Sequence, residues 1–395
     1  MDSKAAPPLP KRQKKLRLAQ RVGLNRAPVA HEMQPCSAHP PAPAPALAAT
    51  DKVKADCTAS SVASVAEAAA SCAPASRAAA TQGATAAAPQ VGRPWTVSVA
   101  LPGSIVDNAQ TQELRSYLVG QVARACAIFN VDEIVLFETE ASRRVASDDH
   151  KGRTSGCVFT ARLLQYLECP QYLRKQCFPH HPDLRSVGLI PPLDAPHHLR
   201  VDESCAYREA VVVERANAKA GSCFVYTGLP KELKLNVEVP VGTRLTLQMP
   251  RVGGKGTAKA VAPREPREEA GLYWGYQVRI APSLSAVWSE CPYQGGYDCS
   301  IGTSEHGSNA LSDGSFRLPN FAHLLVVFGG VEGLEPVVAA DDSLAECEDD
   351  VACLFDHYLN LCPSQGSRTI RTEEALLVGM ATLRPFIEKA HAHSA

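Results

Sequence analysis

Residues 96–138 read TVSVALPGSIVDNAQTQELRSYLVGQVARACAIFNVDEIVLFE, and this stretch decides the fold class. The Val-rich run at 96–101 predicts a β-strand, and VDEIVLFE at 131–138 predicts a second one. The segment between them, 111–129, predicts a helix because apolar residues recur there at helical spacing. These residues are Leu114, Leu118, Val122, Ala125 and Phe129. A strand, a helix and a strand in this order form a β-α-β unit, which predicts an α/β fold with a parallel sheet.

The same alternation returns downstream, after a second apolar helix pattern at 157–169. Apolar strands are predicted at 297–304 and 323–330, and 351–363 is a further strand candidate. The last helix carries an apolar face made of Leu376, Leu377, Met380 and Leu383.

Each of these three strands ends in a polar or glycine-rich segment, at 302–308, 328–335 and 360–370. Ligands in open α/β sheets bind beyond the carboxyl ends of the strands, so the three segments together predict a binding site. The sequence contains neither GxGxxG nor GxxxxGKS/T, which excludes a dinucleotide fingerprint and a P-loop.

Between 205 and 282 the pattern changes to short β-rich runs separated by Gly, Pro or polar turns. Five such runs, the last of them LYWGYQVRIAP, predict a small OB-like Greek-key barrel inserted in the α/β domain. Barrels of this kind often bind single-stranded nucleic acid on an aromatic and basic face. The equally weighted alternative is that half of the residues available for such a face belong to the core. The candidate RNA-binding residues are Arg244, Lys255, Lys259 and Trp274, with Phe224, Tyr226, Tyr273 and Arg279 as further members.

Residues 1–93 are rich in Ala and Pro and nearly free of aromatic residues, which predicts a disordered tail. This tail holds twelve of the 40 Lys and Arg residues but only five of the 41 Asp and Glu residues, so the rest of the chain is acidic. Any nucleic-acid site in the folded part must therefore be a local patch. The basic run PKRQKKLRLAQR at 10–21 indicates a nuclear localisation signal or an RNA-binding arm, and an organelle transit peptide is the alternative.

The fourteen cysteines form no CxxC pair and lie mostly in apolar runs, so we expect free buried thiols in a reducing compartment. The histidine pairs at 180–181 and 197–198 are adjacent rather than four residues apart, and no metal site is expected. No run of about 18 apolar residues is present, which makes a membrane span unexpected.

Four segments resemble the SPOUT class of S-adenosylmethionine-dependent RNA methyltransferases. They are ALPGSIVDNAQTQELRSYL (100–118), ARACAIFNVDEIVLF (123–137), FGGVEGLE (328–335) and LNLCPSQGSRTIRTEEA (359–375). The closest resemblance is to the eukaryotic and archaeal branch with an inserted OB-like domain, and it covers about 94–385. It implies a methyltransferase domain made of 94–204 and 283–395, interrupted by the insert at 205–282.

In that class the C-terminal strands and helix form a trefoil knot, a rare exception to unknotted topology. By resemblance, Gly366 lets the knot-closing loop turn tightly, and main-chain amides and carbonyls hold the adenine of S-adenosylmethionine. The residues that the resemblance assigns to this cofactor are Thr303, Gly329, Gly330, Gly333, Asn360, Gly366, Ser367, Thr369 and Ile370.

IRTEEA (370–375) is similar to the LRTETA of bacterial enzymes that methylate N3 of a ribosomal uridine. By that match Arg371 and Glu373 form a pair that braces the knot, and an ordinary helix-start salt bridge is the equally weighted alternative.

GQVARACAIFNVDEIVLF (120–137) resembles the first motif of the ribose-methylating branch, and Arg124 falls on its arginine. Arg124 would stabilise negative charge near the acceptor nucleotide, unless it is a surface charge on the helix. The asparagine of that motif is replaced by Leu118, which favours a base over a ribose as the target. Asp107 and Asn108 follow the first strand and either face the acceptor or cap the helix.

The resemblance thus implies direct, metal-free methyl transfer to a uridine N3 of ribosomal RNA by a homodimer, and the basic run at 10–21 favours a nuclear location over an organelle. Ribose 2′-O methylation and a non-catalytic RNA-binding scaffold are the alternatives.

Overall fold

The computed structural model of the protein describes residues 92–139, 154–215, 221–250, 256–312 and 314–392. The predicted tail at 1–91, with its basic run, lies outside the described residues, and so does Lys255. None of the helices in the described ranges is long and apolar enough to span a membrane.

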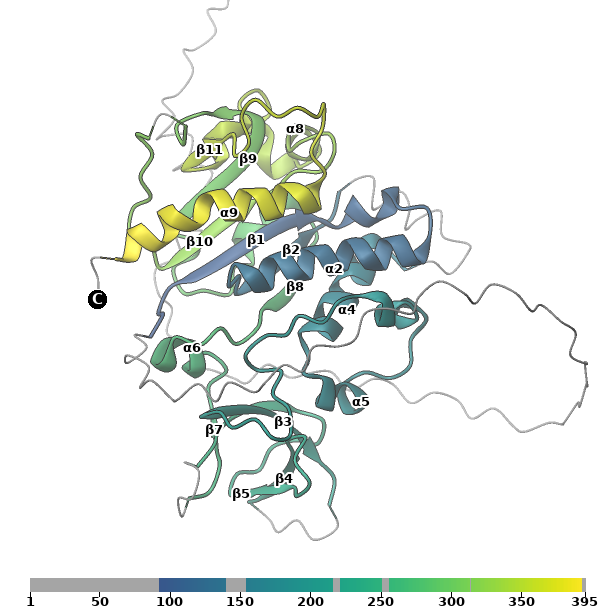
Figure 1. The fold of residues 1–395 in the computed structure, drawn as a ribbon. Coiled ribbons are helices and arrows are strands. Elements are labelled where there is room, and N and C mark those ends of the chain that lie inside the picture. Colours follow the sequence, from purple (N-terminus) through teal and green to yellow (C-terminus); the bar gives the residue numbers. More distant parts are fainter. Residues whose placement is uncertain (1–91, 140–153, 216–220, 251–255, 313, 393–395) are drawn as a thin grey trace, which may run out of the picture. The chain divides into compact units, whose positions relative to one another are not determined.

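A six-stranded sheet in the order β11-β9-β10-β1-β2-β8 forms the centre of the fold (Figure 1). Every neighbouring pair in it is parallel, which confirms the predicted sheet class. The strands are β1 (Thr96–Pro102), β2 (Glu133–Phe137), β8 (Gln277–Ala281), β9 (Cys299–Ser308), β10 (His323–Val327) and β11 (His357–Leu359). All residues of β1 and β2 are buried, as expected for central strands covered on both faces.

Three helices pack on one face of this sheet: α2 (Gln112–Ile128), α4 (Gly156–Glu168) and α9 (Thr372–His391). Thr111 caps α2 by accepting a hydrogen bond from the Leu114 amide at 3.3 Å. Leu376, Met380 and Leu383 of α9 are buried as predicted, whereas Leu114 and Leu377 are about half exposed. The predicted apolar faces of α2 and α9 were therefore correct except at these two positions.

The second face is covered by α7 (Leu284–Ser289), α8 (Glu335–Ala339) and the 3₁₀ turns η5 (Asp342–Cys347) and η6 (Val351–Leu354). The strand candidate at 351–363 is thus mostly turn and loop, and only His357–Leu359 pairs with β9. Cys347 and Cys353 are joined by a disulfide, with a Cα–Cα distance of 6.1 Å. The expectation of free thiols was wrong for this pair, because the tight turn between η5 and η6 brings the two side chains together.

The insert forms a separate antiparallel sheet in the order β5-β4-β3-β6-β7. Its strands are β3 (Tyr207–Val213), β4 (Cys223–Tyr226), β5 (Leu233–Leu235), β6 (Arg244–Gln248) and β7 (Lys259–Val261), and the short helix α6 (Glu265–Ala270) follows them. The fifth predicted strand of the insert, within LYWGYQVRIAP, is β8 and pairs with β2 in the large sheet. Its local pattern is that of any short strand, so only long-range pairing reveals where it belongs.

A buried polar network links the insert to the end of α4. Arg244 of β6 donates to both carboxylate oxygens of Glu168 at 2.6 and 2.9 Å, and to Glu209 of β3 at 2.6 Å. The Trp274 indole donates to the same Glu209 carboxylate at 2.7 Å. Burial, the largest single influence, would raise the pKa of Glu168. The charge of Arg244 and the hydrogen bonds from His197 and Arg244 together outweigh burial and hold that pKa well below its usual value. Two of the predicted RNA-binding residues, Arg244 and Trp274, are therefore engaged inside the protein, while Lys259 is exposed.

His198 makes this joint sensitive to acid. Its Nε2 donates to the main-chain carbonyl of Glu168 at 2.7 Å. Burial lowers the pKa of His198 to about 4, and the neighbouring His197 acts in the same direction. The unfolded chain, in which a histidine has a pKa of about 6.5, therefore takes up this proton at a higher pH than the folded protein does.

Because the folded-state pKa is depressed, the stability that neutral His198 contributes is lost as the pH falls from about 6.5 towards 4. Across this pH window, we expect the unfolding free energy of the wild type to fall by on the order of 2 kcal/mol more than that of the His198→Gln variant. Urea unfolding at pH 7, 6, 5 and 4 measures this difference. His180→Gln, at an exposed histidine, is the control. Identical pH dependence in wild type and His198→Gln would contradict the assignment.

Candidate functional site

The three predicted loop segments meet at one edge of the large sheet, because β9, β10 and β11 are parallel and end on the same side. The first segment is not a simple turn. β9 continues to Ser308, and Tyr358 and Leu359 of β11 pair with Gly302 and Ser308, so residues 303–307 bulge out of the ladder. The bulge places the polar groups of these residues at the carboxyl edge.

Hydrogen bonds fix this bulge to its neighbours on both sides. The Thr303 hydroxyl donates to the Val327 carbonyl at the end of β10, at 3.0 Å. The Asn360 side chain donates to the Glu305 carbonyl at 2.9 Å, and the Asn360 amide donates to the Ser308 carbonyl at 3.0 Å. Thr303 and Asn360, both predicted cofactor residues, are thus brought to the same place.

The second segment is a tight turn after β10. The Gly333 amide donates to the Gly330 carbonyl at 3.1 Å, and Gly333 has a φ of +84°, a value that favours glycine. A Cβ on Gly329 would lie 2.7 Å from the Gly333 carbonyl carbon, whereas a Cβ on Gly330 would meet only Pro102, at 3.7 Å. The turn therefore needs glycine at 329 and 333, but has room at 330.

Helix α9 begins against this turn. The Thr372 hydroxyl donates to the Gly329 carbonyl at 2.9 Å, and the Glu374 carboxylate accepts from the Arg371 amide at 3.0 Å. Among the ion pairs of the described residues, none joins Arg371 to Glu373. The predicted pair was wrong, because Arg371 precedes the helix with an exposed side chain while Glu373 is buried in its first turn.

The third segment, 360–370, crosses between β11 and α9 and is largely exposed. Ser364, with a φ of +58°, is the residue in the left-handed region, and Gly366 is not among the positive-φ glycines. Gly366 lies in a bend without a positive φ, and its predicted role in the knot-closing loop stays a prediction. A Cβ at Gly366 would meet nothing within 4 Å, so this glycine leaves open space beside the main chain. Ser367 donates to the Thr369 carbonyl at 2.8 Å, and Ile370 is half-buried.

These segments offer main-chain donors and acceptors together with carboxylates. Glu335 follows the glycine turn and accepts from the Tyr358 hydroxyl at 3.2 Å, and Glu332 is exposed within it. Main-chain groups suit the edge of an adenine ring, carboxylates suit a cation, and the open space beside Gly330 and Gly366 leaves room for a ligand. The residues present therefore fit S-adenosylmethionine, the expected cofactor. Sequence reasoning missed Thr372 and Glu335, although both lie inside the quoted motifs.

Arg124 does not join this group. Its guanidinium donates to the main-chain carbonyls of Leu193, at 2.6 Å, and Pro192, at 3.4 Å. Helix α2 runs from the carboxyl end of β1 to the amino end of β2, and Arg124 lies near its last turn. The helix thus carries Arg124 towards the opposite edge of the sheet.

Asp107 and Asn108 do lie at the carboxyl edge, in the 3₁₀ turn η1 (Gly103–Asn108) that follows β1. Arg115 of α2 contacts the Asp107 carboxylate at 3.4 Å, and Asn108 is exposed. Asp107 is therefore part of a structural contact, whereas Asn108 is available to a ligand.

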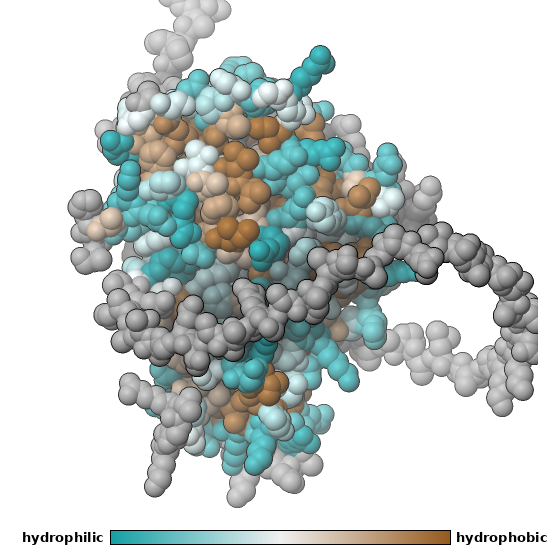
Figure 2. Space-filling view, viewed as in Figure 1, coloured by the Kyte–Doolittle hydropathy of each residue, from teal (hydrophilic) through white to brown (hydrophobic). Residues whose placement is uncertain are grey.

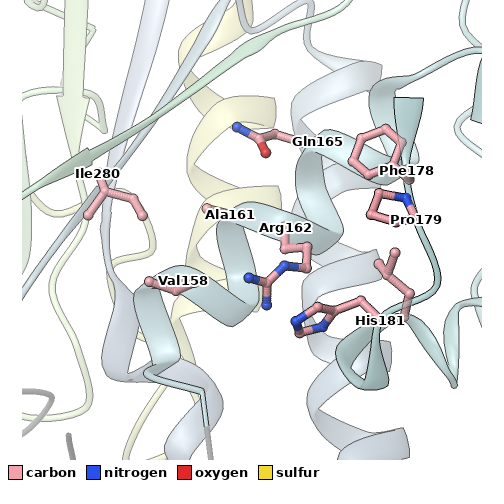
Figure 3. Close-up of a pocket in the computed structure, with 9 residues that line it drawn as sticks. Val158, Ala161, Arg162, Gln165, Phe178, Pro179, His181 and Ile280 are labelled. Carbon is pink, nitrogen blue, oxygen red and sulfur yellow. The ribbon is translucent and has the colours of Figure 1, made fainter. Parts of the chain in front are cut away.

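A cavity of about 270 Å³ lies away from the three segments, on the outer face of α4 (Figure 3). In the part of the chain that the structure describes, no group of three His, Cys, Asp or Glu residues is placed to hold a metal ion.

The comparisons with known proteins identify the family of the chain. A family model described as "Putative RNA methyltransferase" matches residues 96–383. The human 28S rRNA (uridine-N(3))-methyltransferase is 52% identical over 309 residues, which cover 76% of this chain and 81% of the human protein. The mouse protein of the same name is 52% identical over 304 residues (74% and 77%), and the Drosophila melanogaster one 46% over 305 residues (74% and 62%). The chain therefore belongs to this SPOUT-type family of RNA methyltransferases, whose methyl donor is S-adenosylmethionine.

Proposed function

We propose that this protein methylates N3 of a uridine in ribosomal RNA. The observation that carries the proposal is the 52% identity to the human 28S rRNA (uridine-N(3))-methyltransferase across 81% of that protein. The carboxyl edge of the large sheet supports the proposal, since cofactor residues predicted from the resemblance, among them Thr303, Gly329 and Asn360, converge there.

The proposed reaction requires few catalytic side chains. When bound, the cofactor supplies a methyl group already activated on a sulfonium, so the protein must align the acceptor and exclude water. Uridine N3 would lose its imide proton to solvent water, and a guanidinium near the base would stabilise the negative charge. We assign this role to Arg371, because its side chain is exposed next to Thr372, which binds the Gly329 carbonyl. Asn108 lies on the β1 side of the same edge and would contact the acceptor nucleotide.

We also propose the finer architecture that the resemblance implies. The carboxyl-terminal chain would form the trefoil knot, in keeping with the contact of Thr372 with Gly329 and the packing of α9 on Phe328 and Leu361. An experimental structure in which 360–391 passes outside 302–335 would exclude it. The insert would be an OB-like RNA-binding module that ends before β8, and the second part of the methyltransferase domain, expected at 283–395, would instead begin with β8 (Gln277–Ala281). The basic run at 10–21 supports a nuclear location, with an organelle as the alternative.

We further propose a homodimer formed through α2 and α9. Leu114 and Tyr117 of α2 are 54% and 51% exposed, and Leu377 and Val378 of α9 are 46% and 38% exposed. Figure 2 shows apolar residues on the face that carries these two helices. A second copy would cover such a patch.

Loss of the protein should abolish one N3-methyluridine in ribosomal RNA. Mass spectrometry of rRNA nucleosides from cells lacking the protein measures it, and re-expression should restore it. Re-expression of Arg371→Gln should restore about ten-fold less N3-methyluridine than the wild type does, or even less. A folded Arg124→Gln variant should restore the wild-type amount. Loss of a 2′-O-methyl nucleoside instead would establish ribose methylation, and unchanged nucleosides would favour the scaffold.

Cofactor binding should depend on Gly329 and not on Gly330. An added Cβ collides with the Gly333 main chain at 329 but meets only a van der Waals contact at 330. We expect Gly329→Ala to weaken S-adenosylmethionine binding about ten-fold or more, and Gly330→Ala to change it less than about three-fold. Isothermal titration calorimetry of both variants measures this. Equal affinities for wild type and Gly329→Ala would place the cofactor elsewhere.

Charge on the proposed dimer face should separate the subunits. We expect Tyr117→Glu combined with Leu377→Glu to elute with the mass of one 42.2 kDa chain in light scattering, and the wild type with twice that mass. Leu189→Glu, at a residue 65% exposed on another element, is the matched control. A monomeric wild type would refute the dimer.

A further inference from the structure

The cavity on the outer face of α4 has the size and lining of a site for a single base. Its volume is about 270 Å³, below the range typical of drug-sized ligands. Val158 and Ala161 of α4, Ile280 of the edge strand β8, and Phe178 and Pro179 after α5 (Arg174–Cys177) form its apolar walls. In Figure 3 these residues surround Arg162, Gln165 and His181, which supply the polar groups.

The polar groups are positioned to read a base edge. The Nδ1 atom of His181 lies 3.2 Å from the Asp183 amide nitrogen and 3.4 Å from the Asp183 carboxylate, so Asp183 engages this side of the ring and leaves Nε2 for a ligand. Gln165 is exposed and makes no side-chain hydrogen bond to another described residue, so its amide offers both a donor and an acceptor. Arg162 is held by an ion pair with Asp183, which fixes the guanidinium plane at the cavity wall.

The segment that supplies most of the cavity lining exposes positive charge on a chain that is otherwise acidic. Between 156 and 190 the acidic residues are Glu168 and Asp183, and both are buried. The Lys and Arg residues of this segment include Lys175 and Arg185, which are exposed. The charge that this segment presents to solvent is therefore positive, complementary to phosphates rather than to an apolar peptide.

The cavity lies on a path between the insert and the cofactor edge. At one end, α4 begins against η1: a Cβ on Gly156 would lie 2.5 Å from the Gly103 carbonyl and 3.0 Å from the Asp107 carboxylate. At the other end, Phe178 packs against the buried cluster of Cys169, Leu173 and Val211, against which Val213 of β3 and Tyr226 of β4 also pack. The elements that line the cavity thus contact both the turn that follows β1 and the sheet of the insert.

The insert continues the same kind of surface. Phe224 of β4 pairs with Val213 on one side and with Lys234 of β5 on the other, so the three side chains share one face. Lys234 is exposed and Phe224 half-buried. An aromatic ring beside a lysine is the arrangement on which single-stranded nucleic acids stack and bind their phosphates.

We propose that the α4 cavity binds an unstacked nucleotide of the RNA substrate, close to the target uridine, with Phe178 as the stacking platform. The proposal rests on the proposed function, and adds to it a second base site that holds the single strand between the insert and the methyl donor. Sequence-specific RNA recognition commonly works in this way, by splayed bases that stack on aromatic rings and are read along their edges.

The test uses the full-length protein and a fluorescein-labelled 12-nucleotide oligouridine, with binding measured by fluorescence anisotropy. Removal of the aromatic ring in Phe178→Leu should weaken binding about ten-fold, while Phe178→Tyr should bind within about two-fold of wild type. Val158→Trp, at a residue 37% exposed, should fill the cavity without disturbing the core and weaken binding similarly. Ile128→Trp is the matched control, because Ile128 is 50% exposed and lies at the end of α2, outside the cavity.

A second readout locates the strand directly. Oligouridine carrying 4-thiouridine should cross-link, on irradiation, to peptides that contain residues 158–181. Wild-type affinity in both Phe178→Leu and Val158→Trp, or cross-links confined to other segments, would overturn the proposal and leave the cavity to another class of ligand. S-adenosylmethionine affinity should be unchanged in all variants. Failure of the proposed function is distinguishable, because N3-methyluridine would then persist in cells lacking the protein, while RNA binding would still depend on Phe178.

Discussion

Parallel pairing of β9, β10 and β1 is the constraint on which the rest of the structure depends. Strands that run the same way must end at the same edge, so 303–307, 328–335 and the turn after β1 are brought together although they are far apart in sequence. The Thr303 hydroxyl on the Val327 carbonyl ties the first two of these segments together. Helix α9 closes the arrangement through Thr372 on the Gly329 carbonyl. The candidate site is therefore a product of sheet topology more than of any single side chain.

The character of that site follows from how it is built. A sheet edge that carries main-chain amides and carbonyls, with Glu335 and Glu332 nearby, provides fixed dipoles and negative charge rather than acid–base groups. Such an environment suits a cationic methyl donor whose methyl group must be aligned with the acceptor but needs no further activation. The acceptor nucleotide must reach this edge from solvent. In the proposed reaction the exposed Arg371 and Asn108 contact the acceptor, and the positively charged outer face of α4 binds the RNA beside it.

The sequence predicted the β-α-β unit, the parallel sheet and the meeting of the three segments, because local periodicity and strand order determine them. It misplaced β8, since a short edge strand has the same local pattern as a barrel strand, and pairing with β2 is a long-range property. It misread Arg244 and Trp274 for a related reason. Residue type indicates that a side chain can bind RNA, but only the fold shows that Glu168 and Glu209 already occupy it. Motif similarity did not reveal that Arg124 lies near the end of α2 and donates to the Leu193 carbonyl, away from the three segments of its own chain.

The joint at Arg244 also bears on how this architecture arose. The guanidinium is neutralised by Glu209 from the insert and by Glu168 from the methyltransferase domain, so each part supplies half of the compensation. If the insert were excised, its Arg244 would lose the Glu168 carboxylate. The remaining domain would bury Glu168 without its cation, and the loss of one partner of a buried ion pair typically costs several kcal/mol. The two parts are in this sense not interchangeable modules. A lineage that lost or exchanged the small sheet would first have had to replace charges on both sides of the seam.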